Sequence, residues 1–311
     1  MGQKVLVTGG AGFIGSHIVE CLLRRGKTVA VLDNLSTGKR EQVPEGVALY
    51  ELDIAGDVAP AFAEFRPDRV VHQAAQVSVS DSMKDPEADA RVNILGSIRV
   101  IEACRRFGVA KLVYASSAAA YGLLETLPLE ENMRPQPVSC YGASKYTVEH
   151  YLRSAGADWG LEWVTLRYSN VYGPRQDPHG EAGVVAIFSR QLLAGETPTV
   201  FGDGELTRDY IFVEDIAAAN ALVLDVDLSD HTDPVFNVST QVPTTTNRIF
   251  QLVRKTLGST IDCLHGPDRP GDVRHSILDS SKFRRLTGWR PRVGLEEGLE
   301  RTAEFFREKT A

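Results

Sequence analysis

KVLVTGGAGFIGSHIVECLLRRGKTVAVLD, residues 4–33, decides the fold of this chain. Residues 4–8 are a short apolar run typical of a strand, and a run of glycines follows at once. Apolar residues then recur at helical spacing over 17–25, and Gly26 suits the end of that helix. A second apolar run at 28–32 ends in Asp33. Strand, glycine turn, helix, strand and acid, in this order, predict a dinucleotide-binding unit.

Each part of this unit has an expected role. Gly10 is expected to let the chain turn sharply, Gly12 to leave room for a pyrophosphate, and Gly15 to let helix and strand pack closely. The start of the helix offers free N–H groups and the positive end of a dipole. Asp33 would accept hydrogen bonds from both ribose hydroxyls and would repel a 2′-phosphate. We therefore predict NAD rather than NADP as the cofactor, and the alternative is a purely structural glycine turn.

Composition narrows the class of protein. The chain has 311 residues, an ordinary globular composition and a formal net charge of −7. It has no basic run, so nucleic acid is not expected as a partner. No apolar stretch approaches the ~18 residues that a membrane span needs, and the first strand leaves no room for a signal peptide. Four scattered cysteines predict reduced thiols in a cytoplasm, and the histidines show no metal-ligand spacing, so no metal is expected.

Strands and helices alternate through the first half of the chain. Further strands are expected at 47–52, 69–72, 111–115 and 161–166, with helices at 59–65, 86–107 and beyond Cys140. Strict alternation then fades, and the last third resembles a small cap over the strand ends. We predict a Rossmann-type doubly wound parallel α/β sheet with a smaller C-terminal α/β cap. The cofactor domain would span 1–168, with about 213–240 returning to it, and 169–311 would mainly bind the substrate.

Three residues predict redox chemistry on an alcohol or a carbonyl. Tyr141 and Lys145 are four apart, so they share one helix face. A free tyrosine is a poor base because its pKa is about 10, but a nearby lysine favours the phenolate. Tyr141 would then exchange a proton with a hydroxyl as hydride leaves its carbon. Ser117, at the end of a strand, would hold the same oxygen; the alternative is a solvated helix face.

Several motifs together resemble one known family. They are Thr8-Gly9-Gly10-Ala11-Gly12-Phe13-Ile14-Gly15, Asp33-Asn34, His72-Gln73-Ala74-Ala75, Ser116-Ser117, Tyr141-Gly142-Ala143-Ser144-Lys145, Leu166-Arg167-Tyr168-Ser169-Asn170-Val171-Tyr172-Gly173, Thr207-Arg208-Asp209-Tyr210 and Arg269-Pro270-Gly271-Asp272. The chain resembles the extended short-chain dehydrogenase/reductase superfamily over nearly its whole length. Within it, the chain is similar to nucleotide-sugar epimerases of the UDP-glucose 4-epimerase type.

The resemblance implies a tightly bound NAD that is not consumed and an NAD-dependent C4 epimerisation of a UDP-sugar. Tyr141 would be the base, Ser117 would hold the same sugar oxygen, and Lys145 would favour the phenolate form of Tyr141. The expected cofactor-binding residues are Gly9, Gly12, Phe13, Ile14, Gly15, Asp33, Asn34, Ser36, Thr37, Gly38, Asp53, Ile54, Gln73, Ala74, Ala75, Asn93, Ser116, Tyr141, Lys145 and Tyr168. For Asn93, a bond to backbone in the core is an equally open reading. The expected substrate-binding residues are Ser117, Tyr141, Asn170, Gly183, Val184, Phe201, Arg208, Tyr210, Arg269, Asp272 and Ser276.

At a few positions the sequence differs from the family pattern in ways that concern the cofactor, the substrate or the reaction. Val77 stands about where some epimerases have a cofactor-contacting lysine. Ser276 stands about where some carry a bulky tyrosine, so we hypothesise that UDP-GlcNAc and UDP-GalNAc are accepted beside UDP-glucose and UDP-galactose. Related 4,6-dehydratases and decarboxylases carry an acid where this chain reads Ala118-Ala119-Ala120. A dehydratase, a decarboxylase, a reductase and a non-catalytic NAD-binding sensor remain as alternatives. The family usually forms homodimers through helices at about 87–107 and 143–157.

Overall fold

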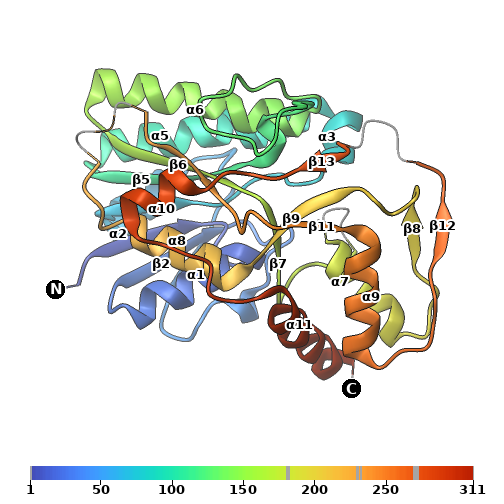
Figure 1. Ribbon diagram of the computed structural model, residues 1–311. Coiled ribbons are helices and arrows are strands. Elements are labelled where there is room, and N and C mark those ends of the chain that lie inside the picture. Colours follow the sequence, from blue (N-terminus) through green and yellow to red (C-terminus); the bar gives the residue numbers. More distant parts are fainter. Residues whose placement is uncertain (1, 180–182, 229–230, 232, 269–272, 311) are drawn as a thin grey trace.

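The computed structural model describes residues 2–179, 183–228, 231, 233–268 and 273–310 (Figure 1). Its larger layer is a parallel sheet of seven strands. These are β1 (Lys4–Thr8), β2 (Thr28–Asp33), β3 (Ala48–Glu51), β4 (Arg69–His72), β5 (Lys111–Ser117), β6 (Glu162–Tyr168) and β10 (Val235–Val238). Their order across the sheet is β10-β6-β5-β4-β1-β2-β3. The order reverses at β1, and open α/β sheets generally bind their ligands beyond the carboxyl ends of the strands at such a point.

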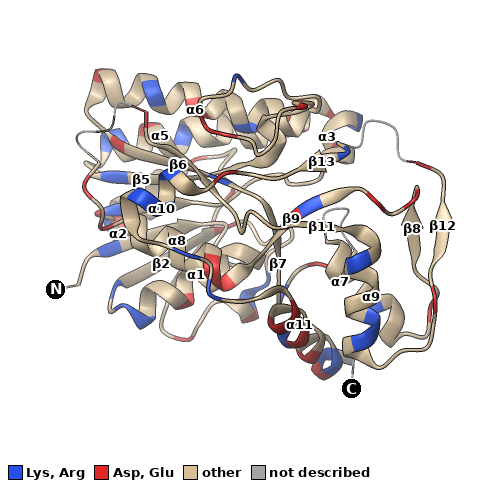
Figure 2. Cartoon of the chain, in the orientation of Figure 1, with Lys and Arg blue, Asp and Glu red and all other residues tan. Residues whose placement is uncertain are grey.

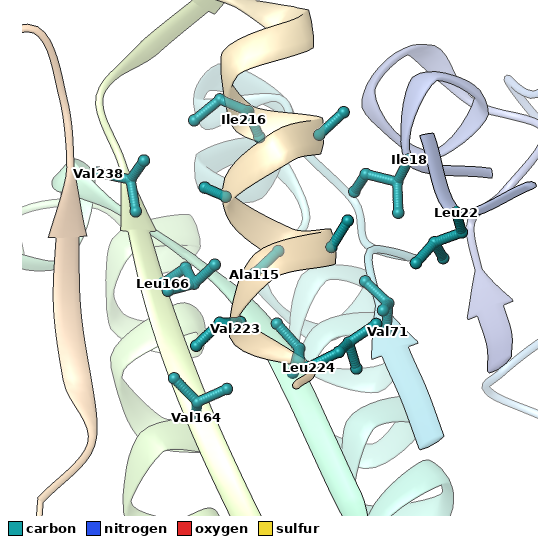
Figure 3. Close-up of a cluster of buried hydrophobic side chains, with 14 of the residues drawn as sticks. Ile18, Leu22, Val71, Ala115, Val164, Leu166, Ile216, Val223, Leu224 and Val238 are labelled. Carbon is teal, nitrogen blue, oxygen red and sulfur yellow. The ribbon is translucent and has the colours of Figure 1, made fainter. Parts of the chain in front are cut away.

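Helices cover both faces of this sheet. One face carries α1 (Phe13–Arg24), α8 (Val213–Val223) and α10 (Ser281–Thr287), and the other carries α2 (Ala59–Phe65), α5 (Ser97–Arg106) and α6 (Cys140–Trp159). Figure 3 shows the first core, where Ile18 and Leu22 of α1 lie in one cluster with Ile216 of α8 and with Leu224, the residue that follows this helix. Both faces of every central strand are buried, which explains their continuous apolar runs.

The helix expected over 86–107 contains an irregular segment. It consists of α4 (Pro86–Ala90), a π-helical segment Arg91–Gly96 that contains Asn93, and then α5. A short helix not predicted from the sequence, α3 (Val79–Lys84), precedes it. A π-helical segment widens the turn locally and is frequent at functional sites.

The smaller layer lies at the carboxyl end of the large sheet. Its central sheet joins β7 (Asn170–Tyr172), β9 (Thr207–Phe212), β11 (Pro243–Thr245) and β13 (His275–Ser276), and β8 (Thr199–Phe201) pairs with β12 (Leu264–Gly266). Helices α7 (Val184–Leu193), α9 (Thr246–Leu257) and α11 (Leu295–Thr310) pack there (Figure 1). Helix α8 and strand β10 rejoin the large layer.

The Rossmann-type fold with a smaller cap, expected from the sequence, is confirmed. The apolar residues near 261–264 predict a strand there, but the observed strand, β12, begins only at Leu264 and ends at Gly266. In the described part of the chain, no helix has both the length and the apolar character needed to cross a bilayer. Basic and acidic residues are interspersed over the view in Figure 2, in keeping with the modest net charge of −7.

Candidate active site

The glycine-rich loop joins β1 to α1, and its glycines have distinct geometric roles. Gly9, not Gly10, makes the turn: its φ is +69°, and an added Cβ would lie 2.6 Å from the backbone nitrogen of Ala74. The expectation for Gly10 was wrong, because a Cβ there would instead meet Val31 at 2.7 Å. The expectation for Gly15 is met, because a Cβ there would lie 2.0 Å from the Gly9 carbonyl oxygen.

The start of α1 fits a dinucleotide phosphate. Gly12 is the N-cap, no side chain caps the first turn, and no acidic residue lies in it. The first N–H groups of a helix have no partner within the helix. A Cβ at Gly12 would meet only the Gly9 carbonyl oxygen, at 3.2 Å, so the space over this residue is open on its other sides. This uncapped helix start, with the positive end of its dipole, suits an anion.

Asp33 links the glycine-rich loop to the loop after β2. Its side chain is buried, and its two oxygens accept backbone N–H groups from Ala11 at 3.0 Å and Leu35 at 2.9 Å. Gly38 packs against it, since a Cβ there would lie 2.9 Å from Oδ1. Asn34 donates to Asp53 Oδ2 at 3.1 Å. The carboxylate expected to bind ribose is thus fixed in place, and it retains free lone pairs for hydroxyl groups.

The ends of β4 and β6 carry another group of expected cofactor residues. Gln73 Nε2 donates to the Tyr168 hydroxyl at 3.0 Å, and that hydroxyl donates to Asn220 Oδ1 at 2.9 Å. The backbone N–H of Ala74 donates to Thr8 Oγ1 at 3.3 Å, which fixes this small-residue segment beside the glycine turn. The Tyr168 side chain therefore contacts α8 and holds Gln73 at the strand ends.

Ser117, Tyr141 and Lys145 lie together, as the helical spacing predicted. Ser117 ends β5 and lies beside the Tyr141 side chain, whose pKa it lowers by hydrogen bonding. The Lys145 ammonium lies 5.9 Å from the centre of the Tyr141 ring and donates to the Ala115 carbonyl oxygen at 2.9 Å. A Cβ at Gly142 would lie 2.4 Å from the Ala119 carbonyl oxygen, so α6 begins tightly against the residues after Ser117.

The pKa of Tyr141 is raised, although a nearby lysine was expected to favour its phenolate form. Burial lowers the pKa of Lys145 to about 8, while the charge of Asp89 opposes that fall. Burial raises the pKa of Tyr141; the hydrogen bond from Ser117 lowers it, and Asp89 raises it further. Lys145 alone therefore does not bring the pKa of Tyr141 below its ordinary value, because desolvation outweighs the favourable contacts.

Asn93 lies in a buried network between the π-helical segment and α6. Its Oδ1 accepts from the Gln76 backbone N–H at 2.8 Å, and its Nδ2 donates to Ser144 Oγ at 3.1 Å and Asp89 Oδ1 at 2.9 Å. Ser144 Oγ in turn donates to the Tyr141 carbonyl oxygen at 3.0 Å. Of the two roles that the sequence left open for Asn93, these contacts favour the structural one, in which its side chain bonds to backbone within the core, over a contact with the cofactor.

The expected substrate residues of the smaller layer come from neighbouring strands. Asn170 of β7 is opposite Tyr210 of β9, and Ser276 of β13 is opposite Arg208 of β9. Tyr210 is buried, and burial raises its pKa to about 12.

Other expected substrate residues frame the same layer. Gly183 precedes α7 as its N-cap, Val184 begins that helix, and Phe201 ends β8. Arg269 and Asp272 lie outside the described residues.

Sequence reasoning missed the residues that hold this site together. Asp209 is fully buried and accepts hydrogen bonds from Thr240 N at 2.9 Å and Gln241 N at 2.9 Å, which fixes β9 between Arg208 and Tyr210. Asp89 is also buried beside the Tyr141 cluster. Asp89 lies between two alanines, which was the available sign, whereas Asp209 lies between Arg208 and Tyr210 and bonds to residues some thirty positions along the chain.

Two more missed contacts join α1 to the loop after β7. His17 Nε2 lies 3.0 Å from the Pro174 carbonyl oxygen, and Arg175 donates to Ser16 Oγ at 3.1 Å. The first turns of α1 are thus fixed directly to the start of the smaller layer.

Fold and site together define a dinucleotide-dependent enzyme with a Ser-Tyr-Lys cluster. A family model described as the NAD dependent epimerase/dehydratase family matches residues 5–239. The chain therefore belongs to this family. It is an NAD-using, UDP-glucose 4-epimerase-like enzyme of the epimerase class.

Three solved structures show how far the similarity extends. A UDP-glucose 4-epimerase from Thermotoga maritima, solved with UDP-glucose, is 44% identical with a TM-score of 0.95, covering 99% of this chain and 100% of that one. A Thermus thermophilus UDP-glucose 4-epimerase in complex with NAD is 50% identical, with a TM-score of 0.93 and coverage of 98% and 99%. A UDP-N-acetylglucosamine 4-epimerase from Methanobrevibacter ruminantium, in complex with UDP-N-acetylmuramic acid, is 37% identical, with a TM-score of 0.93 and 99% coverage of both chains.

Proposed function

We propose that this nucleotide-sugar epimerase inverts C4 of a UDP-sugar, UDP-glucose and UDP-galactose first of all, through a transient 4-keto sugar. The observation that carries the proposal is that Ser117, Tyr141 and Lys145 lie together at the carboxyl end of β5, with the Lys145 ammonium 5.9 Å from the centre of the Tyr141 ring, while the uncapped start of α1 follows β1 of the same sheet. The solved relatives with UDP-glucose and with NAD support the choice of substrate and cofactor.

The residues of this chain handle the proton. Bound NAD supplies the acceptor that takes hydride from C4 and returns it, and its oxidised form adds positive charge. Tyr141 takes the proton of the C4 hydroxyl and gives it back after the keto sugar has presented its other face. Ser117 holds the same sugar oxygen, and its hydrogen bond to Tyr141 favours the phenolate. Lys145 adds positive charge below the ring.

The loop after Ser117 favours epimerisation over elimination. Ala118–Ala120 form a short 3-10 helix, and the Ala119 N–H donates to Ser117 Oγ at 3.1 Å. A dehydratase needs an acid near the C6 hydroxyl to protonate the leaving group, and these three alanines offer no such side chain. The smaller layer would hold the nucleotide, with Arg208 on a phosphate.

We propose that the large layer, 1–168 with 213–240, binds NAD and that 169–311 mainly bind the UDP-sugar. We also propose a homodimer through the helices at about 87–107 and 143–157, where Leu95 and Tyr151 are 49% and 45% exposed. The four cysteines are free thiols, which favours a reducing compartment, and we propose the cytoplasm.

The test is direct. Purified protein is incubated with UDP-galactose, and separately with UDP-GalNAc, without added cofactor, and the products are read by proton NMR. The C4 epimer is expected, because the protein recycles bound NAD. Absence of any epimer, even with NAD supplied, would refute the proposal and direct attention to other nucleotide sugars and to elimination.

A further inference from the structure

Helix α6 carries three chemically important side chains on one face. Tyr141, Lys145 and Glu149 are spaced four residues apart, so they lie one above another along the helix. Glu149 is completely buried at 0% exposure, and the proposed chemistry gives it no part. A fully buried carboxylate requires partners, since an isolated charge in the core is costly.

The hydrogen-bond partners of Glu149 come from the two strands beneath it, and the Nη2 atom of Arg153, on the same helix, lies 3.8 Å from Oε2. Arg167 donates to both carboxylate oxygens, through Nε at 2.9 Å and Nη2 at 2.6 Å. The Ser116 hydroxyl donates to Oε1 at 2.8 Å. Ser116 of β5 and Arg167 of β6 are directly opposite each other in the strand register. Three charge-assisted hydrogen bonds thus join α6 to the ends of β5 and β6.

The same guanidinium also supports the loop that follows Ser117. The centre of the Arg167 guanidinium lies 4.7 Å from the middle of the Tyr121 ring. The Tyr121 hydroxyl donates to Asn237 Oδ1 of β10 at 2.8 Å. The 3-10 helix Ala118–Ala120 therefore lies between two anchored points, Ser116 and Tyr121.

We propose that the Glu149–Arg167 pair, with Ser116, is a positioning device that sets the distance between Ser117 on the strand and Tyr141 and Lys145 on the helix. This inference rests on the function proposed above. Apolar side chains of similar volume would stabilise the core at least as well as a buried ion pair. The pair also fixes how α6 is oriented relative to β6, because a planar guanidinium and a carboxylate form two hydrogen bonds in only one relative geometry. Ser116 transmits that geometry to its neighbour Ser117.

Two variants test the device without leaving a buried charge unpaired. Ser116→Ala removes the link to the strand, and Arg167→Lys keeps the charge but loses the two-pronged geometry. Glu162→Gln is the matched control, because Glu162 pairs with Lys111 at 2.7 Å across the same two strands at their opposite end. For each purified protein we would measure kcat and KM for UDP-galactose, bound NAD and the melting temperature.

We expect both site variants to lose kcat by on the order of 10- to 100-fold, because small misplacements of reacting groups are costly. In Arg167→Lys, KM and bound NAD should remain near their wild-type values, and Glu162→Gln should keep its kcat. An unchanged kcat in both site variants would overturn the proposal, as would a kcat loss in Arg167→Lys that is explained by missing NAD or by unfolding.

Amide hydrogen exchange tests the positioning role of the Glu149–Arg167 pair independently of enzyme activity. If the wild-type protein shows no epimerase activity, the proposed function fails, but the positioning role is still measurable. Exchange at 114–121 and 141–149 should be faster in Arg167→Lys than in Glu162→Gln. Equal exchange in the two variants would overturn the positioning role.

Discussion

Replacing Gly12 by alanine should separate cofactor binding from folding. The backbone of Gly12 has φ −83° and ψ −179°, which any residue adopts, and the added Cβ meets only one atom, at 3.2 Å. We therefore expect the free energy of unfolding of the NAD-free protein to fall by less than about 1 kcal/mol, the usual difference between glycine and alanine at an N-cap. The new methyl group would occupy the open space over the start of α1. NAD should bind at least about 10-fold more weakly, which corresponds to about 1.4 kcal/mol.

Gly15→Ala is the informative contrast. Its Cβ would lie 2.0 Å from one backbone atom and within 2.9 Å of two others, so the strand and helix must move apart. Overpacking of this kind typically costs about 1–3 kcal/mol, which lowers the melting temperature by roughly 2–4 °C per kcal/mol in a large domain.

Calorimetric titration with NAD and thermal melting without it measure both effects. Gly12→Ala should lose NAD affinity and keep its melting temperature, whereas Gly15→Ala should lose both. Wild-type NAD affinity in Gly12→Ala would refute the assignment of this loop to the pyrophosphate.

Three further predictions concern the site and the core. Tyr141→Phe should lower epimerase turnover by about 10²- to 10⁴-fold while bound NAD is retained; retained turnover would exclude Tyr141 as the base. Ser276→Tyr should suppress the reaction of UDP-GalNAc more than that of UDP-galactose, and Ser276→Ala should spare both; equal losses on the two sugars would contradict the role of Ser276. Burial lowers the pKa of His72 to about 3, so the unfolded chain takes up a proton first as the pH falls. The free energy of unfolding should therefore decrease by about 1.4 kcal/mol per pH unit between roughly 6.5 and 3 through this group, and urea unfolding of a His72→Asn variant should show a shallower dependence.

Local sequence patterns predicted the large layer well. Residues 4–33 contain a complete strand–turn–helix–strand unit, and β10 coincides with the apolar run at 235–238. The spacing of Tyr141 and Lys145 was informative because an α-helix fixes which residues share a face. Short elements were missed: β7 and β11 have three residues each and β13 has two, which is too few for a period to be visible.

The supporting contacts of the site were not predictable in the same way. Glu149 and Arg167 are each unremarkable on their own, and only the pairing of β5 with β6 beneath α6 brings them together. The sharp turn was assigned to Gly10, whereas Gly9 makes it. Adjacent glycines are indistinguishable in a sequence, and only the positive φ of Gly9 identifies it as the turn residue. The raised pKa of Tyr141 also depends on burial and on Asp89, whose place in the fold no local pattern indicates.

The late return of β10 to the large sheet has a consequence for how the protein is made. Among the described residues, β6 pairs with β5 on one side and with β10, residues 235–238, on the other. An uncovered strand edge is a template for pairing with other chains. At roughly 5–20 residues per second, a ribosome needs several seconds to make the intervening segment. During those seconds the nascent chain carries an open edge, and this is the interval in which a chaperone would be of most use to it.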